Sequence, residues 1–129
     1  MTGISIADTV RVVTGTPREF LPLPAAQFHV LVALTEGEKH GYRLMHDVAA
    51  QSGGMVKMGP GTLYGTLKKL CAQGLLEQSS VRPDAALDDE RRRYYALTEL
   101  GAAVCETEAA RLAGLARLAH HNLRARAAT

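Results

Sequence analysis

Residues 59–74 read GPGTLYGTLKKLCAQG, and this stretch decides which fold the chain is expected to adopt. Leu63, Leu67 and Leu70 follow one another at intervals of four and three residues, which places their side chains on one face of an α-helix. The proline at the second position suits the first turn of a helix, and the glycine at the last position suits its end. The stretch therefore predicts a helix over residues 59–73 with a single apolar face.

The face opposite these leucines combines small residues with cations, namely Gly61, Gly65, Lys68, Lys69 and Ala72. An exposed glycine inside a helix costs about 1 kcal/mol relative to alanine, so two of them favour close approach to another molecule. Residues 55–74 contain three lysines and no acid, and the first turn adds the positive end of the helix dipole. The pattern is typical of a surface that meets phosphates, although a solvated face with Tyr64 half-buried against the core explains the same residues.

On the C-terminal side of this helix, extended segments over residues 75–81 and 93–97 are separated by a polar loop over residues 82–92. This arrangement predicts a two-stranded hairpin with a long tip. Thr98 then offers an N-cap to a last helical segment, whose apolar period continues to about residue 127.

On the N-terminal side, two further segments have helical periodicity. The first begins at residue 25 and is broken at residues 36–38, and the second runs over residues 42–49 and stops at the Ser-Gly-Gly of residues 52–54. Two prolines separate both segments from residues 1–20, for which a short helix, a swapped strand and a mobile arm stay open.

The order of elements is three helices, a hairpin and a long last helix, which predicts a mainly α winged helix-turn-helix with a two-stranded β wing. We expect an N-terminal arm or short helix over residues 1–23, a DNA-binding domain over residues 24–97 and a C-terminal dimerisation helix over residues 98–129. Small three-helix domains with a hairpin also serve in roles without DNA, so the order alone does not decide the function.

The predicted wing, residues 82–92, has charges of both signs. A triple arginine, Arg91, Arg92 and Arg93, stands where the second strand begins and suits a minor groove or its phosphates. Four acids in the same loop would repel phosphates at short range, namely Asp84, Asp88, Asp89 and Glu90. These residues leave open whether the tip of the wing contacts DNA.

The long last helix needs a partner. A helix over residues 98–127 is about 45 Å long, more than a small winged domain covers with its own core. Regularly spaced apolar residues along its second half favour packing against the same helix of a second subunit. The predicted dimer contacts are Leu112, Leu115, Leu118 and Leu123.

The composition excludes several classes of protein. A chain of 129 residues with 47% hydrophobic side chains suits one globular domain, and two distant cysteines suit reduced thiols. The sequence contains no apolar run near the roughly 18 residues of a membrane span and no signal-like N-terminus, so we expect a cytoplasmic protein without a membrane partner. Nucleotide loops and nucleophile motifs are absent, and the five histidines lack ligand spacing, so we expect neither an enzyme, a cofactor nor a metal site.

Four short motifs follow one another along the chain: HGY at residues 40–42, GTLY at 61–64, GLL at 74–76 and RRRYYALTELG at 91–101. Together, over about residues 24–104, they resemble the PadR family of bacterial transcriptional regulators. The resemblance implies a homodimeric winged-helix repressor that binds a palindromic operator in double-stranded DNA and releases it when a small-molecule effector binds. The single last helix is similar to that of the short PadR subfamily.

Carried over to this chain, the resemblance makes residues 59–73 the recognition helix in the major groove and residues 82–92 the wing at the flanking minor groove or backbone. His40 is expected to cap a helix or border the core, and Gly41 to form a turn. The chain departs from the family pattern at Gly65, where proline is common, and in the acids of the wing. The predicted DNA-binding residues are Lys57, Gly61, Thr62, Tyr64, Lys68, Lys69, Arg91, Arg92 and Arg93.

An effector would need a pocket that communicates with the dimer contact. Phe28, His29 and Met45 are candidate walls of such a pocket, although each also suits the plain core. The alternative function is a dimeric ligand-binding or protein-interaction module on a winged-helix scaffold that does not bind DNA.

Overall fold

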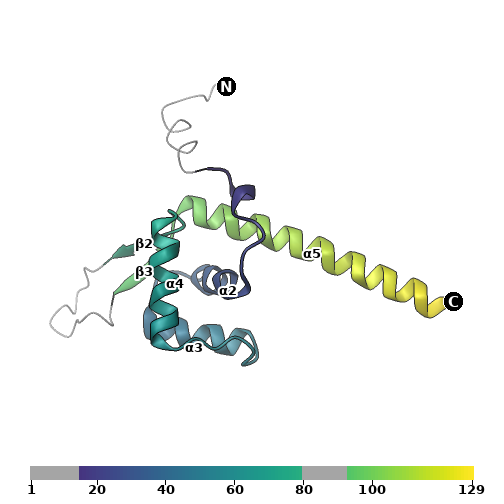
Figure 1. The fold of residues 1–129 in the computed structure, drawn as a ribbon, viewed down its shortest axis with the longest axis horizontal. Coiled ribbons are helices and arrows are strands. Elements are labelled where there is room, and N and C mark those ends of the chain that lie inside the picture. The colour runs from purple at the N-terminus through teal and green to yellow at the C-terminus, as the bar shows by residue number, and fades with distance from the viewer. Residues whose placement is uncertain (1–14, 80–92) are drawn as a thin grey trace, which may run out of the picture.

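The structure is a computed structural model that describes residues 15–79 and 93–129 (Figure 1). The predicted helices are all present, with bounds that differ by a few residues from the expected ones. In chain order the elements are the 3-10 helix η1 (Pro17–Phe20), α2 (Ala25–Leu34), β1 (Lys39–His40), α3 (Gly41–Gln51), α4 (Pro60–Ala72), β2 (Leu76–Ser79), β3 (Tyr94–Leu97) and α5 (Glu99–Ala128).

One apolar core lies between α2, α3 and α4, and the first turns of α5 complete it. Leu63, Leu67 and Leu70 are at most 1% exposed, so the predicted apolar face of α4 is confirmed. Burial of each leucine side chain stabilises the fold by roughly 2 kcal/mol, which fixes the rotation of α4 about its own axis. The opposite face of α4 is therefore turned outward.

A small antiparallel sheet lies beside the helices. β2 pairs with β3, with Leu76 opposite Leu97, and this pairing confirms the predicted hairpin as far as the structure describes it. Its loop, residues 80–92, lies outside the described residues. β1 adds a third strand on the other edge of β3, with His40 opposite Tyr94. The sequence did not predict β1, because two residues are too few to show alternation.

Both predicted caps are present at the ends of helices. The backbone N–H of Gly101 donates to Thr98 Oγ1 at 2.9 Å, so Thr98 is the N-cap of α5. The backbone N–H of Arg43 donates to His40 Nδ1 at 3.2 Å, so His40 caps α3.

The expected role of Gly41 as a turn residue is wrong. Gly41 is the buried first residue of α3, and a Cβ built on it would lie 2.3 Å from the hydroxyl oxygen of Tyr64. Glycine is needed here because the aromatic ring occupies the space of a side chain, which joins the HGY motif to the GTLY motif in three dimensions.

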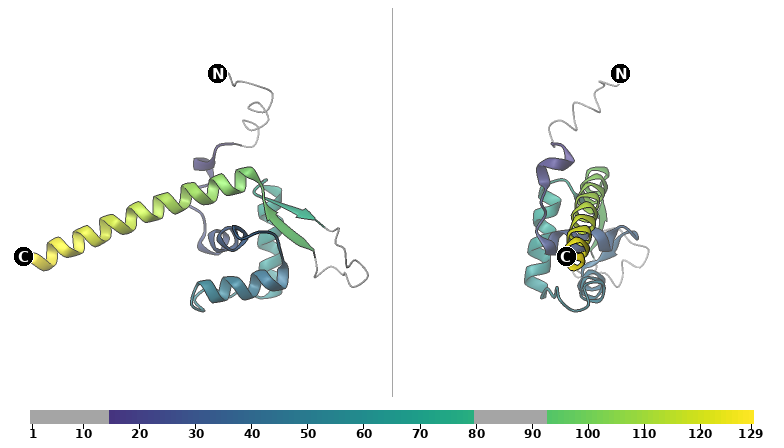
Figure 2. Two further views of the ribbon diagram at one scale, coloured as in Figure 1. Left: turned by 180° about the vertical axis from the view of Figure 1, so that it is seen from behind. Right: turned by 90° about the vertical axis from the view of Figure 1, so that its right-hand side faces the viewer.

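The segment before α2 crosses α5. Figures 1 and 2 show the chain passing from η1 on one side of α5 to α2 on the other. Phe20 and Leu21 pack against the core, and the backbone N–H of Leu23 donates to Glu108 Oε2 at 3.0 Å. Of the arm expected over residues 1–23, the part up to residue 14 lies outside the described residues.

Candidate nucleic-acid interface

The outward face of α4 carries the residues that the sequence singled out. Gly61, Thr62, Gly65, Lys68 and Lys69 are all exposed. A Cβ built on either glycine would meet nothing within 4 Å in the part of the chain that the structure describes. The face is therefore smooth and cationic, and another molecule has access to the helix backbone.

The N-terminus of α4 adds hydrogen-bond donors to this face. Its N-cap is Gly59, and among the described residues no side chain caps it. The first turn of a helix leaves its N–H groups without intrahelical acceptors, so those of Gly61 and Thr62 could donate to an anion. Lys57, in the loop just before, is also exposed.

Tyr64 differs from the other predicted contact residues. Its side chain is half-buried, and its ring packs against Gly41 at the start of α3. Tyr64 thus joins the two helices of the helix-turn-helix, and it presents less surface to a partner than the lysines do.

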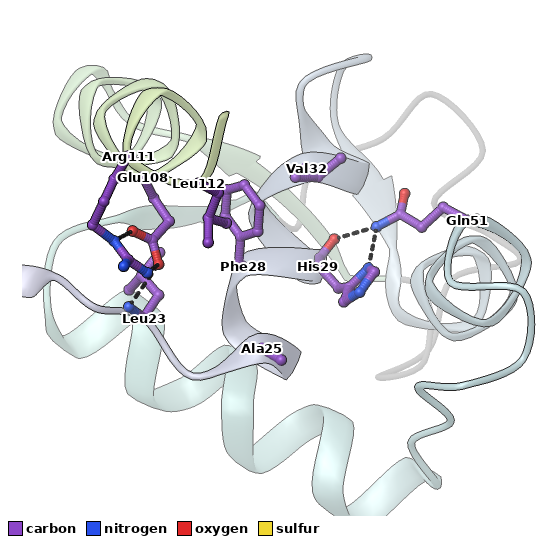
Figure 3. A pocket seen from close by; sticks show the side chains of 9 residues that line it. All are labelled: Leu23, Ala25, Phe28, His29, Val32, Gln51, Glu108, Arg111 and Leu112. Carbon is purple, nitrogen blue, oxygen red and sulfur yellow. Dashed lines mark hydrogen bonds and ion pairs between the residues drawn. The ribbon is translucent and has the colours of Figure 1, made fainter. Parts of the chain in front are cut away.

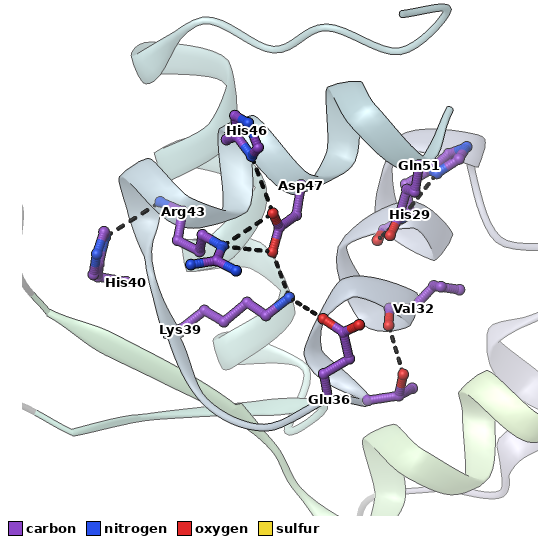
Figure 4. Close-up of polar contacts among 10 residues, drawn as sticks. His29, Val32, Glu36, Lys39, His40, Arg43, His46, Asp47 and Gln51 are labelled. Atoms are coloured by element: carbon purple, nitrogen blue, oxygen red, sulfur yellow. Dashed lines mark hydrogen bonds and ion pairs between the residues drawn. The ribbon is translucent and has the colours of Figure 1, made fainter. Parts of the chain in front are cut away.

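A polar cluster that the sequence analysis missed holds α3 to β1 (Figure 4). Lys39, 9% exposed, donates from Nζ to Glu36 Oε1 at 2.6 Å and also to Asp47 Oδ2. Arg43 Nε donates to both oxygens of Asp47 at 3.1 Å, and His46 Nδ1 lies 3.2 Å from Oδ1. The spacing of Arg43 and Asp47 on one helix signals their contact, whereas the contact of Asp47 with Lys39 depends on the fold.

The charge on Asp47 is strongly favoured. Burial alone would raise its pKa, but hydrogen bonds from Lys39, His46 and Arg43 outweigh burial and lower the pKa from 3.8 to about 2. Burial likewise would lower the pKa of Lys39, but its hydrogen bonds to Asp47 and Glu36 raise it. The pair is therefore ionised near neutral pH and holds α3 to β1 and to the connection before it.

At the base of the wing, only part of the predicted arginine cluster can be placed. Arg93 is exposed, directly before β3. Arg91 and Arg92 lie outside the described residues, as does the whole loop 82–92. The structure thus places one cation of the three beside the sheet.

The second half of α5 extends away from the body (Figure 2). The four predicted dimer residues are large hydrophobic side chains on its surface: Leu112 is 36% exposed, and Leu115, Leu118 and Leu123 are each 54–55% exposed. No residue of α5 beyond Glu108 is buried. Among the described residues, this half of the helix therefore contributes nothing to the buried core, and its leucines are left at the surface.

A pocket of about 490 Å³ opens between α2, the end of α3 and α5 (Figure 3). Phe28 and His29, two of the three predicted effector residues, line it together with Leu112. Gln51 Nε2 donates to the carbonyl oxygen of His29 at 2.8 Å and forms a polar corner of the pocket. Met45 is not among the lining residues, because it packs against the core from α3.

Comparison with known proteins decides the family. The sequence profile described as the transcriptional regulator PadR-like family matches residues 30–107, which is more than half of the chain. The chain belongs to the PadR-like family. The resemblance drawn from the four motifs is therefore confirmed, and membership of the short subfamily stays a prediction.

Two curated relatives align with this PadR-like chain over 93 residues each. A transcriptional regulator of Mycobacterium tuberculosis is 33% identical, over 72% of this chain and 80% of the relative. An uncharacterized 37.1 kDa protein in a transposon of Streptomyces fradiae is 41% identical over 69% of this chain, and the match covers 24% of that protein's length.

A solved structure supports the fold of this PadR-like chain. Bacillus subtilis PadR in complex with operator DNA is 21% identical, with a TM-score of 0.56, over 67% of this chain and 47% of that protein. The likeness confirms the winged-helix architecture. Within residues 15–79 and 93–129, no helix is long and apolar enough to cross a membrane.

Proposed function

We propose that this PadR-like chain binds double-stranded operator DNA as a homodimer and places α4 in the major groove. The observation that carries the proposal is the contrast between the two faces of α4. Leu63, Leu67 and Leu70 are buried, whereas the opposite face presents glycines and lysines to the surroundings. A helix whose outer face is both smooth and cationic suits insertion between two phosphate backbones.

The groups on this face divide into two kinds of contact. Lys57 and Lys69 supply charge for phosphates, together with the N–H groups at the start of α4. Thr62 and Lys68 reach base edges, and Tyr64 acts mainly by holding α4 against α3. Arg93, with Arg91 and Arg92, serves the minor groove or the backbone beside the wing.

The homodimer rests on α5. Four exposed leucines, Leu112, Leu115, Leu118 and Leu123, give this helix an apolar surface beyond the body. Packing against a second copy removes that surface from water and places two copies of α4 in one dimer. Two-fold symmetry then requires a palindromic operator, whose half-sites are read one helical turn apart, roughly 34 Å.

Regulation as an effector-responsive repressor is supported by the pocket next to α5. The pocket walls come from both the body and α5, at Phe28 and Leu112, so an occupant changes the contact between these two parts. A ligand that prefers one separation of the two α4 helices, and DNA that prefers another, would then oppose each other. Repression follows if bound protein blocks transcription.

Selection of duplexes from a random pool, followed by a salt titration, tests the proposal. We expect enriched duplexes to contain an inverted repeat, and binding to weaken by orders of magnitude between about 50 and 200 mM salt. If the protein is a dimer that enriches no DNA sequence, and if its affinity for a protein or ligand does not change with salt, the alternative holds: it is an interaction module that does not bind DNA.

A further inference from the structure

Glu108 lies at the point where α5 leaves the body. Its side chain is 1% exposed, and it is the last buried residue of the helix. Oε2 of Glu108 accepts from the backbone N–H of Leu23 at 3.0 Å, across 85 positions of sequence. One carboxylate therefore connects the segment that leads into α2 with the departure point of α5.

Arg111 completes the set of donors around this carboxylate (Figure 3). Its Nε donates to Glu108 Oε1 at 2.6 Å, and its Nη2 donates to Oε2 at 2.9 Å. The hydrogen bonds from Arg111 lower the pKa of Glu108, burial opposes them, and the N–H of Leu23 adds to the lowering. A buried charge with three directed donors tolerates less displacement than an apolar contact does, because any shift leaves a polar group unpaired.

The other fixed point of α5 is its first turn. Thr98 Oγ1 donates to the carbonyl oxygen of Gly74 at 2.6 Å. A Cβ on Gly101 would lie 2.0 Å from the carbonyl oxygen of Leu75, so the helix backbone touches the end of the α4–β2 connection. Two fixed points, at Gly101 and at Glu108, define the direction of the helix axis.

The free half of α5 magnifies any change of this direction. Gly101 and Glu108 are about 10 Å apart along the axis, and Leu123 is about 33 Å from Gly101. A displacement of 1 Å at Glu108 thus becomes about 3 Å at Leu123. Successive base pairs are separated by a similar distance, about 3.4 Å.

We infer that Glu108 is a positioning residue: by clamping α5 to the segment at Leu23, it sets the angle of α5 and so the half-site spacing that the dimer accepts. The inference rests on the proposed function, since it requires dimerisation through α5 and DNA reading by α4. Glu108 itself contacts no DNA. Its effect is on the geometry of the pair of reading helices.

Operators of altered spacing test this role. Duplexes selected by the wild type are remade with the half-sites one or two base pairs closer or farther apart, and their affinities are measured for wild type, Glu108→Leu, Glu108→Gln and Glu106→Gln. Glu106 is exposed on the same helix, so Glu106→Gln is the matched loss of charge. The preference for one spacing is the ratio of the affinity for the selected spacing to the affinity for an altered spacing. We expect this ratio to be about fivefold or more smaller for Glu108→Leu than for the wild type. Glu108→Gln keeps an acceptor for Leu23 and should lie between Glu108→Leu and the control.

The ratio of affinities separates positioning from plain stability. If Glu108→Leu lowers thermal stability, or affinity at every spacing alike, and leaves the ratio unchanged, the inference is overturned. If Glu108→Leu does not fold, an unchanged ratio in Glu108→Gln overturns it equally.

A wild type that selects no duplex refutes the proposed function first. The inference is then decided by the separation of the two α4 helices in the dimer. A spin label is introduced at position 69 of each subunit on a genetically encoded amino acid, and the distance between the two labels is measured. Glu108→Leu should broaden this distance distribution, and an unchanged one overturns the inference. A monomeric wild type overturns both.

Discussion

Gly41 and Tyr64 meet where α3 and α4 cross, and the aromatic ring fills the volume that a side chain on residue 41 would need. The ring carbon Cζ would lie 2.6 Å from a Cβ on Gly41, well inside ordinary van der Waals contact. Tyr64 sits on the helix whose outer face we assign to DNA. The packing under α4 therefore decides how that face is presented.

Gly41→Ala should destabilise the protein by about 1–3 kcal/mol, because the added methyl group forces the ring or the helix to move. Urea denaturation measures this as a lower midpoint with an unchanged slope. In the double variant with Tyr64→Ala the added cost of Gly41→Ala should largely vanish. Additive costs in that double-mutant cycle would show that the two residues are not coupled.

Gly65→Ala should have opposite effects on stability and on binding. A Cβ at this position meets nothing within 4 Å in the described chain, so alanine should stabilise α4 by up to about 1 kcal/mol. The same methyl group should weaken DNA binding, because it stands on the face that approaches the groove. Thermal melts check the expected increase in stability, and a gel-shift assay checks the expected decrease in DNA affinity. An alanine variant that binds as tightly as the wild type would remove Gly65 from the interface.

Lys68→Ala should reduce operator affinity. Because each dimer then loses two cations from the groove, the dependence of binding on salt should also fall, by up to about two counterions. Lys68 is exposed on α4, so the dimer and the fold should be unaffected. Arg117→Ala removes an exposed cation from the far half of α5 and is the control for total charge. Equal losses from both substitutions would mean that charge in general, and not the face of α4, drives binding.

The sequence predicts well those elements of the fold that are long enough to show a periodic pattern of apolar residues. Leu63, Leu67 and Leu70 identify both the buried face of α4 and, by contrast, its outer face, because a helix repeats over enough residues to be recognised. β1 is too short for such a signal. It becomes a strand only because His40 and its neighbour meet the edge of β3, which is a tertiary contact.

The contacts that position the candidate site are the ones that the sequence conceals. Glu108 occurs in a helical pattern as an ordinary acid, and nothing local indicates that Leu23 donates to it from 85 residues away. The same holds for Lys39 and Asp47, which come together only once α3 has packed. Periodicity identifies which surfaces are exposed, whereas long-range polar contacts determine their orientation.

Asp47 should give the protein a specific loss of stability in acid. Its pKa is lowered from 3.8 to about 2 in the folded chain, so its contribution is complete above about pH 4 and disappears as the pH falls through about 2. The shift corresponds to about 2 kcal/mol. As the pH is lowered from 6 to 2, the urea midpoint should fall more steeply for the wild type than for Asp47→Asn. The variant should be less stable than the wild type at pH 6 and should approach it at pH 2.

The control for this pH series is Glu77→Gln, which removes an exposed carboxylate from β2. Its curve should follow that of the wild type, because an exposed acid contributes little to folding. Curves for Asp47→Asn and the wild type that stay parallel down to pH 2 would contradict the importance of the cluster around Asp47.

A chain that ends at residue 111 should be a folded monomer that binds operator DNA poorly. It keeps all the buried residues of α5, and both Glu108 and Arg111, so the winged-helix body should melt cooperatively. It lacks the exposed leucines, beginning with Leu112, that we assign to the dimer. Light scattering gives its mass, and a gel-shift assay compares it with the full chain. A tight dimer from the truncated chain would place the subunit contact on the body itself, and the long helix would then need another partner.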